Sequence, residues 1–252
     1  MELFIHSGPE ALGEKAGKEA ASLIRSAIAS HNEAFIILAT GTSQFATLKT
    51  LVAAEGIEWN KVTAFHLDEY IGVSESHRAS FRKYIKERFI AKVPALKKVY
   101  LINGETVISD EIKRLNNAIQ DIHIDLALVG IGENGHLAFN DPPANFETEN
   151  PYIVVDLNEA CRKQQMGEGW FRTIHEVPIK AISMSVKQIM KSKNIVCSVP
   201  DQRKAQAVLN TMTKTVSNLF PASILRNHPK CHLHLDPYSS SLLPPTILKK
   251  AN

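Results

Sequence analysis

Two adjacent carboxylates, Asp68 and Glu69, follow the apolar run 62–67. Neighbouring side chains on an extended chain point to opposite sides, so we expect at most one of these carboxylates to face a cleft. A carboxylate in a partly dry cleft can have its pKa raised toward neutral pH, and it can then act as a general base. A solvated acidic turn is the competing interpretation, and the Asp-Glu pair alone favours it.

The loop 130–143 carries a histidine, His136, that three glycines precede and Asp141 follows. The glycines allow a tight backbone with positive φ, which would hold the imidazole at the edge of a sheet. Asp141 is near enough to fold back and fix the tautomer of the ring, as the acid of a hydrolase triad does. An imidazole with a carboxylate behind it suits proton transfer to a sugar oxygen. A loop histidine bonded only to backbone is the weaker alternative here.

Two segments could bind an anion. The turn 40–43, Thr-Gly-Thr-Ser, follows an apolar run and opens a helix, so its N–H groups and hydroxyls could hold a phosphate, or its side chains could simply cap the helix. Arg203 and Lys204 stand in the first turn of another predicted helix, where they oppose the helix dipole. A bound anion would offset that conflict, although a solvated basic turn is equally compatible. The turn lacks a dinucleotide fingerprint and a Walker motif, which argues against NAD and ATP.

Two further patterns carry less weight. The run Cys231-His232-Leu233-His234 suggests zinc, but no second ligand pair stands at a suitable spacing, and its alternation favours a strand. We therefore predict no metal. Gln164 and Gln165, beside Arg162, could reach a phosphate or could form a solvated helix face, and the sequence leaves both open.

Short apolar runs alternate with segments of helical period, and these are the elements that must position the residues above. The predicted strands are 3–5, 35–39, 62–67, 99–101, 126–129, 152–155, 181–184, 195–198 and 231–235. The predicted helices are 10–30, a segment through 48–52, 80–89, 110–121, 158–166, 186–191 and 203–210. Strands that are apolar on both faces indicate an α/β fold with a parallel sheet covered on both sides. Ligands of such sheets bind beyond the carboxyl ends of the strands, which favours the loops after Ala39, Leu67, Val129 and Ser198.

Composition excludes several classes of protein. No linker-like segment divides the 252 residues, so we expect one domain over 1–252. A net charge of +3 is too small to argue for nucleic acid, and no apolar run approaches the ~18 residues of a membrane span. The first residues lack the pattern of a secretion signal, and three widely separated cysteines fit reduced thiols, so we expect a cytoplasmic protein.

Taken together, these loops resemble the glucosamine-6-phosphate deaminase (isomerase) family, whose superfamily also includes 6-phosphogluconolactonases. The likeness covers nearly the whole chain. Its most specific part is Asp-Glu-Tyr followed by Gly-x-Gly-x-x-Gly-His-x-Ala-Phe-Asn. The segments that carry it are 39–43, 65–72, 130–142, 177–178, 181–184 and 221–225.

The resemblance implies a three-layer Rossmann-like α/β fold with a mostly parallel central sheet, and an enzyme of amino-sugar metabolism without an organic cofactor. The enzyme would convert glucosamine 6-phosphate, or its epimer galactosamine 6-phosphate, to fructose or tagatose 6-phosphate and ammonia. By the same resemblance, Asp68 would move a proton between C2 and C1, His136 would open the sugar ring, and Asp141 would support His136. The residues implied to hold the phosphate are Gly41, Thr42, Ser43 and Lys204, and those implied to complete the substrate site are Thr40, Glu69, Gly135 and Arg162. The family includes monomers and hexamers, so the resemblance allows a homo-oligomer.

The chain departs from the family's pattern at three places. Asn134 stands beside the catalytic histidine where well-known members have Asp, so His136 loses an anionic neighbour and we expect ring opening to titrate at lower pH. The family's second phosphate cation has no certain counterpart, and Arg162 or Arg172 could substitute for it. The segment 145–153 contains no Lys or Arg, so we do not expect allosteric activation by a sugar phosphate.

Two other functions compete with deamination. Lactonases of the superfamily usually have Arg where Tyr70 stands, and they lack the Ala-Phe-Asn that follows His136, so hydrolysis of a sugar lactone ranks lower. A sugar-phosphate sensor without turnover would fit Asn134 and the missing arginine. Regulators with this fold carry a DNA-binding module, however, and the sequence has no spare segment for one.

Overall fold

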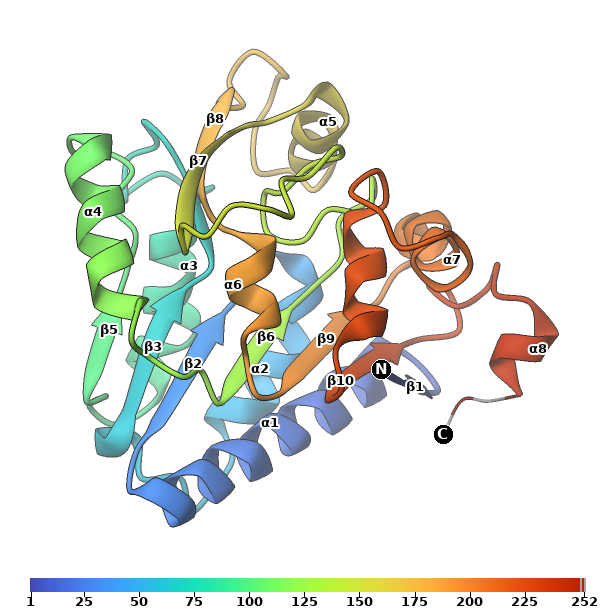
Figure 1. The fold of residues 1–252 in the computed structure, drawn as a ribbon, viewed down its shortest axis with the longest axis horizontal. Coiled ribbons are helices and arrows are strands. Elements are labelled where there is room, and N and C mark those ends of the chain that lie inside the picture. Colours follow the sequence, from blue (N-terminus) through green and yellow to red (C-terminus); the bar gives the residue numbers. More distant parts are fainter. Residues whose placement is uncertain (250, 252) are drawn as a thin grey trace.

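Seven parallel strands form the central sheet of the structure, a computed structural model that describes residues 1–249 and 251. The order across the sheet is β1, β10, β9, β6, β2, β3 and β5, and every neighbouring pair is parallel (Figure 1). The strands are β1 (Glu2–Ile5), β2 (Ala34–Leu38), β3 (Val62–His66), β5 (Lys98–Tyr100), β6 (Leu126–Val129), β9 (Ile195–Val199) and β10 (Cys231–Leu235).

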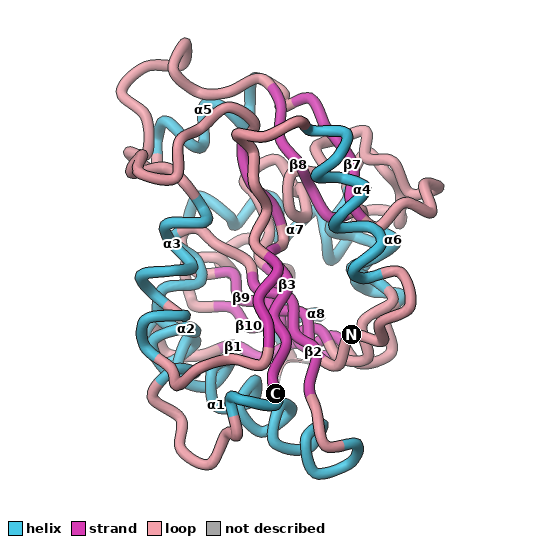
Figure 2. The backbone as a smooth tube through the Cα atoms, turned by 90° about the vertical axis from the view of Figure 1, so that its left-hand side faces the viewer, coloured by secondary structure: helices cyan, strands magenta, loops and turns pink. Residues whose placement is uncertain are grey.

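Helices cover both faces of this sheet. One face packs against α1 (Pro9–His31), α2 (Phe45–Val52) and α3 (Phe81–Arg88), and the other against α4 (Ile108–Ile119), α6 (Val186–Met190), α7 (Ala205–Thr213) and a 3₁₀ segment, η5 (Pro221–Asn227). Ile36 of β2 joins the first core and Ile37 joins the second, because successive side chains of a strand point to opposite faces. Figure 2 shows the strands edge-on between the two helical layers. The predicted α/β class is therefore confirmed.

A second, smaller sheet lies beyond the edge of the first. It consists of β4 (Asp68–Tyr70), β8 (Lys180–Met184) and β7 (Tyr152–Asp156) in that order, and both pairings are antiparallel. The sequence analysis placed 152–155 and 181–184 in the parallel sheet, which is wrong. Residues along β7 alternate between more buried and more exposed, as in an antiparallel sheet with one face toward water.

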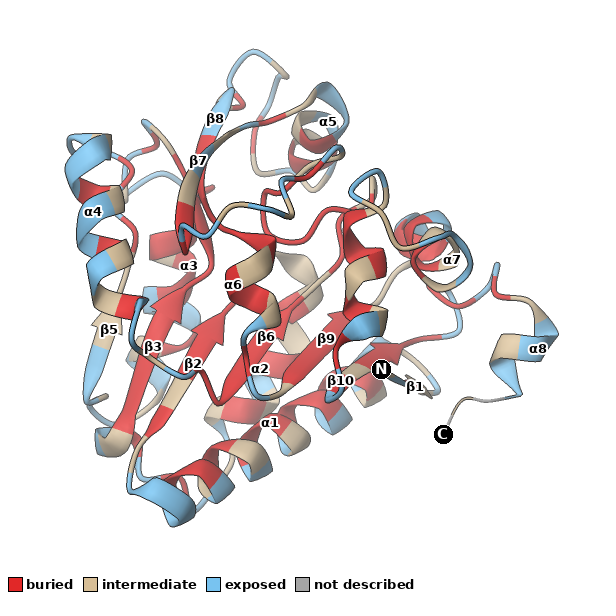
Figure 3. Ribbon diagram, viewed as in Figure 1, coloured by how far each residue is buried: buried red, intermediate tan, exposed pale blue. Residues whose placement is uncertain are grey.

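The strand ends of the central sheet and the small sheet meet at one edge of the molecule. The strands β2, β3, β6 and β9 all point their carboxyl ends to this edge, and β3 continues after Leu67 into β4 (Figure 1). The central strands are largely buried, so the loops beyond them are where polar groups can reach a ligand (Figure 3). The helix α5 (Glu159–Gly167) closes over these loops, and α8 (Pro245–Leu248) lies near the C-terminus. Among the described residues, no helix has both the length and the apolar character that crossing a membrane requires.

Candidate active site

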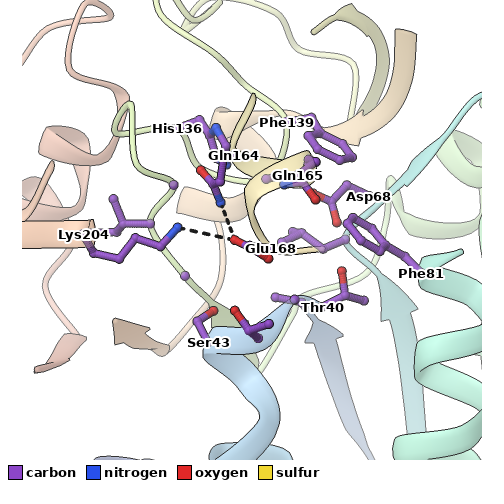
Figure 4. Close-up of a pocket in the computed structure, with 18 residues that line it drawn as sticks. Thr40, Ser43, Asp68, Phe81, His136, Phe139, Gln164, Gln165, Glu168 and Lys204 are labelled. Atoms are coloured by element: carbon purple, nitrogen blue, oxygen red, sulfur yellow. Dashed lines mark hydrogen bonds and ion pairs between the residues drawn. The ribbon is translucent and has the colours of Figure 1, made fainter. Parts of the chain in front are cut away.

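A cavity of about 70 Å³ lies beyond the carboxyl ends of β2, β3 and β6 (Figure 4). Seven of the site residues predicted from the sequence line this cavity: Thr40, Gly41, Thr42, Ser43, Asp68, His136 and Lys204. The structure thus brings together the two groups proposed for proton transfer and the two segments proposed for anion binding.

Asp68 sits at the start of β4 with its carboxyl group toward the cavity. The residue is only 6% exposed. Burial raises the pKa of Asp68 to about 8, and the negative charge of Glu69 adds to the rise. A carboxyl group with a pKa near neutral can both take up and release a proton at physiological pH, which is what a general base needs.

Glu69 points away from the cavity, as the alternation along an extended chain requires. Its carboxylate accepts hydrogen bonds from the backbone N–H groups of Tyr70 (3.0 Å), Phe81 (3.2 Å) and Arg82 (2.7 Å), and from the Ser80 hydroxyl (3.1 Å). Burial raises the pKa of Glu69, and these donors oppose the rise. The implied substrate-binding role of Glu69 is corrected: its carboxylate satisfies the free N–H groups that begin α3.

His136 is held from behind by Asp141. Its Nδ1 lies 3.0 Å from Asp141 Oδ1, and the two side chains are 9% and 6% exposed. Burial alone would raise the pKa of Asp141, but hydrogen bonds from His136, Asn134 and the backbone N–H of Asn158 lower it. The carboxylate therefore stays charged and fixes the orientation of the ring, which leaves Nε2 for a ligand.

The glycines of this loop have different functions. A Cβ on Gly132 would lie 2.2 Å from His136 Nε2, so any side chain there would displace the imidazole. Gly135 has the positive φ (86°) that the sequence analysis expected. Gly135 does not line the cavity, contrary to its implied role in substrate binding, and its carbonyl accepts the N–H of Ala222.

The end of the cavity that is predicted to bind an anion is formed by the turn at Gly41 and by Lys204. The turn leads into a 3₁₀ segment, η1 (Thr42–Gln44), and the Tyr84 hydroxyl donates to the Gly41 carbonyl over 3.1 Å. The Lys204 side chain is 6% exposed, and burial lowers its pKa. It is the one Lys or Arg among the described residues that line the cavity.

Arg162 does not reach the cavity. Its guanidinium donates to the carbonyl oxygens of Ile174 (2.6 Å) and Val177 (3.0 Å), so it braces the loop after α5 and is not free for a phosphate. Arg172 is exposed. Neither residue supplies the second phosphate cation that the sequence analysis sought.

Several residues of the cavity wall were left open or unassigned by the sequence analysis: Phe81, Phe139, Gln164, Gln165 and Glu168. Gln164 Oε1 accepts the N–H of Glu133 (2.8 Å), and Gln165 Oε1 accepts the Tyr70 hydroxyl (2.6 Å). A signal for the two glutamines existed, because they stand three and four residues after the buried Cys161 on one face of α5. Their polarity concealed that this face is buried.

One group of side chains has the composition of a metal site. A nitrogen of His136, an oxygen of Asp141 and the sulfur of Cys161 lie within 4.8 Å of one another. Burial raises the pKa of the Cys161 thiol well above its usual range, and the charges of Asp141 and Asp68 add to the rise. A thiol that keeps its proton is a poor metal ligand, so the arrangement favours the His136–Asp141 pair. The run 231–234 forms β10, as predicted, with His232 and His234 bonded to Glu19.

The family model described as glucosamine-6-phosphate isomerases/6-phosphogluconolactonase matches residues 7–233. The chain belongs to this family. A glucosamine-6-phosphate deaminase of Bacillus velezensis is 34% identical over 229 residues, which cover 88% of this chain and 93% of that protein. The corresponding protein of Streptococcus uberis is 33% identical over 231 residues, or 91% of this chain and 96% of its own.

Solved structures show the same fold. A monomeric glucosamine-6-phosphate deaminase superposes with a TM-score of 0.87 at 29% identity, over 96% of this chain and 100% of its own. A 6-phosphogluconolactonase of Thermotoga maritima superposes with a TM-score of 0.77 at 15% identity, over 93% of this chain and 99% of its own. The Rossmann-like fold implied by the resemblance is confirmed, and the likeness to the lactonase concerns the fold alone.

Asn134, the departure from the family's pattern beside the histidine, contacts Asp141. Its Nδ2 donates to Asp141 Oδ1 over 2.8 Å and lies 3.4 Å from Asn158 Oδ1, while its Oδ1 accepts the N–H of His136 over 3.1 Å. Its side chain therefore orients the acid behind the histidine.

We expect Asn134→Asp to change the pH dependence of kcat, because a hydrogen bond to a charged group is replaced by a contact between two carboxylates. Two carboxylates at this distance share a proton at low pH, so the charge behind His136 comes to depend on pH. The measurement is kcat between pH 5.5 and 9, with Asn150→Asp as a control that makes the same change at an exposed position. A variant whose kcat follows the same pH profile as the wild type would show that Asp141 does not need the amide.

Proposed function

We propose that the cavity binds a hexosamine 6-phosphate and converts it to a ketohexose 6-phosphate and ammonia, as a glucosamine-6-phosphate deaminase does. One observation carries the proposal: Asp68, His136, Lys204 and the turn at Gly41 all line a single cavity. An acid and an imidazole for proton transfer therefore lie beside groups suited to a phosphate.

The proposed reaction begins with His136. With its Nδ1 held by Asp141, the imidazole gives a proton from Nε2 to the ring oxygen of the sugar as the bond between that oxygen and C1 breaks. The same nitrogen takes back the proton of the C1 hydroxyl, so the pyranose opens to the 2-amino aldehyde. Asp68, in its ionised form, then takes the proton from C2 and delivers it to C1. A second proton passes from the protonated amino group at C2 to O1. The C1 aldehyde thereby becomes an alcohol and C2 becomes a protonated imine. Water adds to the imine and expels ammonia, which leaves the ketone of the ketohexose 6-phosphate.

The phosphate end is proposed to fix the sugar for this transfer. Backbone N–H groups of Gly41, Thr42 and Ser43 and the Lys204 ammonium would bind the phosphate, while Thr40 lies between that end and Asp68 (Figure 4). Both glucosamine 6-phosphate and its epimer galactosamine 6-phosphate carry the amino group and phosphate that this mechanism uses.

The purified protein should release one ammonia for each ketohexose 6-phosphate formed from one of these two substrates, and coupled assays of both products measure this. The same preparation is also tested with 6-phosphogluconolactone, because the alternative function is a lactonase, which would hydrolyse this lactone and release no ammonia. If neither amino sugar phosphate yields ammonia, the proposal is overturned. Binding of the sugar phosphate without turnover would instead support a sensor.

A further inference from the structure

A buried carboxylate lies at the anion-binding end of the cavity. Glu168 follows α5, and its side chain is 5% exposed. Its Oε1 is 3.9 Å from Lys204 Nζ and accepts a hydrogen bond from Gln164 Nε2 (2.9 Å), while its Oε2 accepts one from Trp170 Nε1 (3.1 Å). Figure 4 shows the carboxylate in the middle of the cavity, between Lys204 and the turn that carries Thr40 and Ser43.

Little free volume remains in the cavity while Glu168 occupies this position. Its volume is about 70 Å³, whereas pockets that bind small molecules measure roughly 300 Å³ or more. Glu168 stands between Gly167 and Gly169, and Gly169 has a φ of 80°, a backbone conformation that side chains disfavour. Because glycine backbone can rotate freely, the two glycines would let the Glu168 side chain leave the cavity without any movement of the central sheet.

The charges of Lys204 and Glu168 also indicate that Glu168 must move when a phosphate binds. Burial of Lys204 disfavours its charged form and lowers its pKa, and the nearby charge of Glu168 acts in the opposite direction. A phosphate dianion at Lys204 would repel Glu168 strongly at this depth, because two like charges a few ångströms apart are poorly screened. The two anions therefore exclude each other at Lys204.

We infer that Glu168 is the counter-ion of Lys204 in the empty cavity, and that the phosphate of the substrate binds by displacing it. The inference rests on the proposed function in taking a phosphate ester as the displacing anion. It makes Glu168 a specificity-determining residue: an uncharged sugar cannot replace the carboxylate at Lys204, so the cavity stays closed to it. The inference also explains how a cation is tolerated at the start of a helix, where it opposes the helix dipole. When no ligand is bound, the negative charge of Glu168 offsets the charge of Lys204.

The test is the affinity for inorganic phosphate, measured by titration calorimetry. We expect Glu168→Gln to bind phosphate about tenfold more tightly than the wild type, because the amide keeps the shape of the side chain and removes the competing charge. The matched control is Glu159→Gln, which makes the same change on α5 at a side chain that is 71% exposed and paired with Lys163; it should leave the affinity unchanged. Equal or weaker binding by Glu168→Gln would overturn the inference.

A second measurement on the unaltered protein observes the displacement itself. Trp170 loses its Glu168 partner when phosphate binds, so its fluorescence should change along the phosphate titration. The other tryptophan, Trp59, packs against Phe89 in the core and provides a constant background. Lys204→Met should abolish both the change and the binding. Phosphate binding without a response from Trp170 would show that Glu168 stays in place.

The ammonia assay separates this inference from the proposed function. Tighter phosphate binding by Glu168→Gln in a protein that releases no ammonia would leave the inference standing and remove the deaminase proposal. Ammonia release together with an unchanged phosphate affinity would do the reverse.

Discussion

Asp68→Asn is expected to lower kcat by about a thousandfold or more, because a general base contributes roughly 10²–10⁴ to a rate and an amide cannot take up the C2 proton. The amide has nearly the shape of the acid, and the phosphate contacts proposed for Lys204 and Ser43 do not involve Asp68. Binding of fructose 6-phosphate, measured by calorimetry, should therefore survive. Loss of binding with the loss of turnover would mean that Asp68 organises the cavity and does not carry the proton.

The same substitution should make the folded protein more stable. The pKa of Asp68 is about 8 in the folded protein, against 3.8 for an ordinary aspartate, so between these pH values the folded chain holds a proton that the unfolded chain has released. The free energy of unfolding must then fall as pH rises from about 4 to about 8. An asparagine has no such proton, so we expect the variant to gain roughly 2–4 kcal/mol at pH 8 and almost nothing near pH 4.

Urea unfolding at pH 4.5, 6 and 8 measures this gain. The control is Asp156→Asn, because the Asp156 side chain is 80% exposed and its ion pair with Lys180 lies at the surface. A gain that does not grow with pH would show that Asp68 ionises normally in the folded protein. Stabilisation combined with lost turnover is the pattern expected of a catalytic group whose burial is kept for function.

The parallel sheet could be predicted from the sequence because its strands are apolar on both faces. All four residues of β6 are buried, and the predicted run 126–129 has the same limits. The helix predicted over 10–30 is α1, Pro9–His31, and its spaced alanines and isoleucines pack on the sheet. The strand β4 could not be predicted in this way. Three residues that begin with Asp-Glu have no strand pattern of their own, and they become a strand only through pairing with β8.

Some residues of the candidate site could likewise be predicted from the sequence, and others could not. Asp68 and His136 could be located because each comes soon after an apolar strand, in a segment whose composition is unusual. Glu168 could not be located, because nothing near it in the sequence indicates that α5 folds over the cavity and places it against Lys204. Arg162 was misassigned because its charge suggests a phosphate, whereas backbone carbonyls of the neighbouring loop use its donors. Tertiary contacts between distant segments decide such cases.

Glu69→Gln is expected to destabilise the protein by roughly 3 kcal/mol, because it leaves buried N–H donors without acceptors. The Glu69 side chain is fully buried, and its two oxygens accept from three backbone N–H groups and the Ser80 hydroxyl, with Arg82 Nε at 3.5 Å. The amide retains one oxygen and turns an NH₂ group toward N–H donors. The start of α3 thereby loses much of its cap.

The matched control for Glu69 is Glu105→Gln. Glu105 pairs with the same arginine, at 2.7 Å from Arg82 Nη2, but its side chain is 40% exposed, and exposed pairs are worth about 1 kcal/mol or less. Urea unfolding at pH 7 compares the two variants. Because the charge of Glu69 helps to raise the pKa of Asp68, Glu69→Gln should also move the ascending limb of kcat/KM to lower pH. If Glu69→Gln instead raises KM and leaves the free energy of unfolding unchanged, Glu69 binds substrate. The description of the site, in which Glu69 lies outside the cavity, would then be wrong.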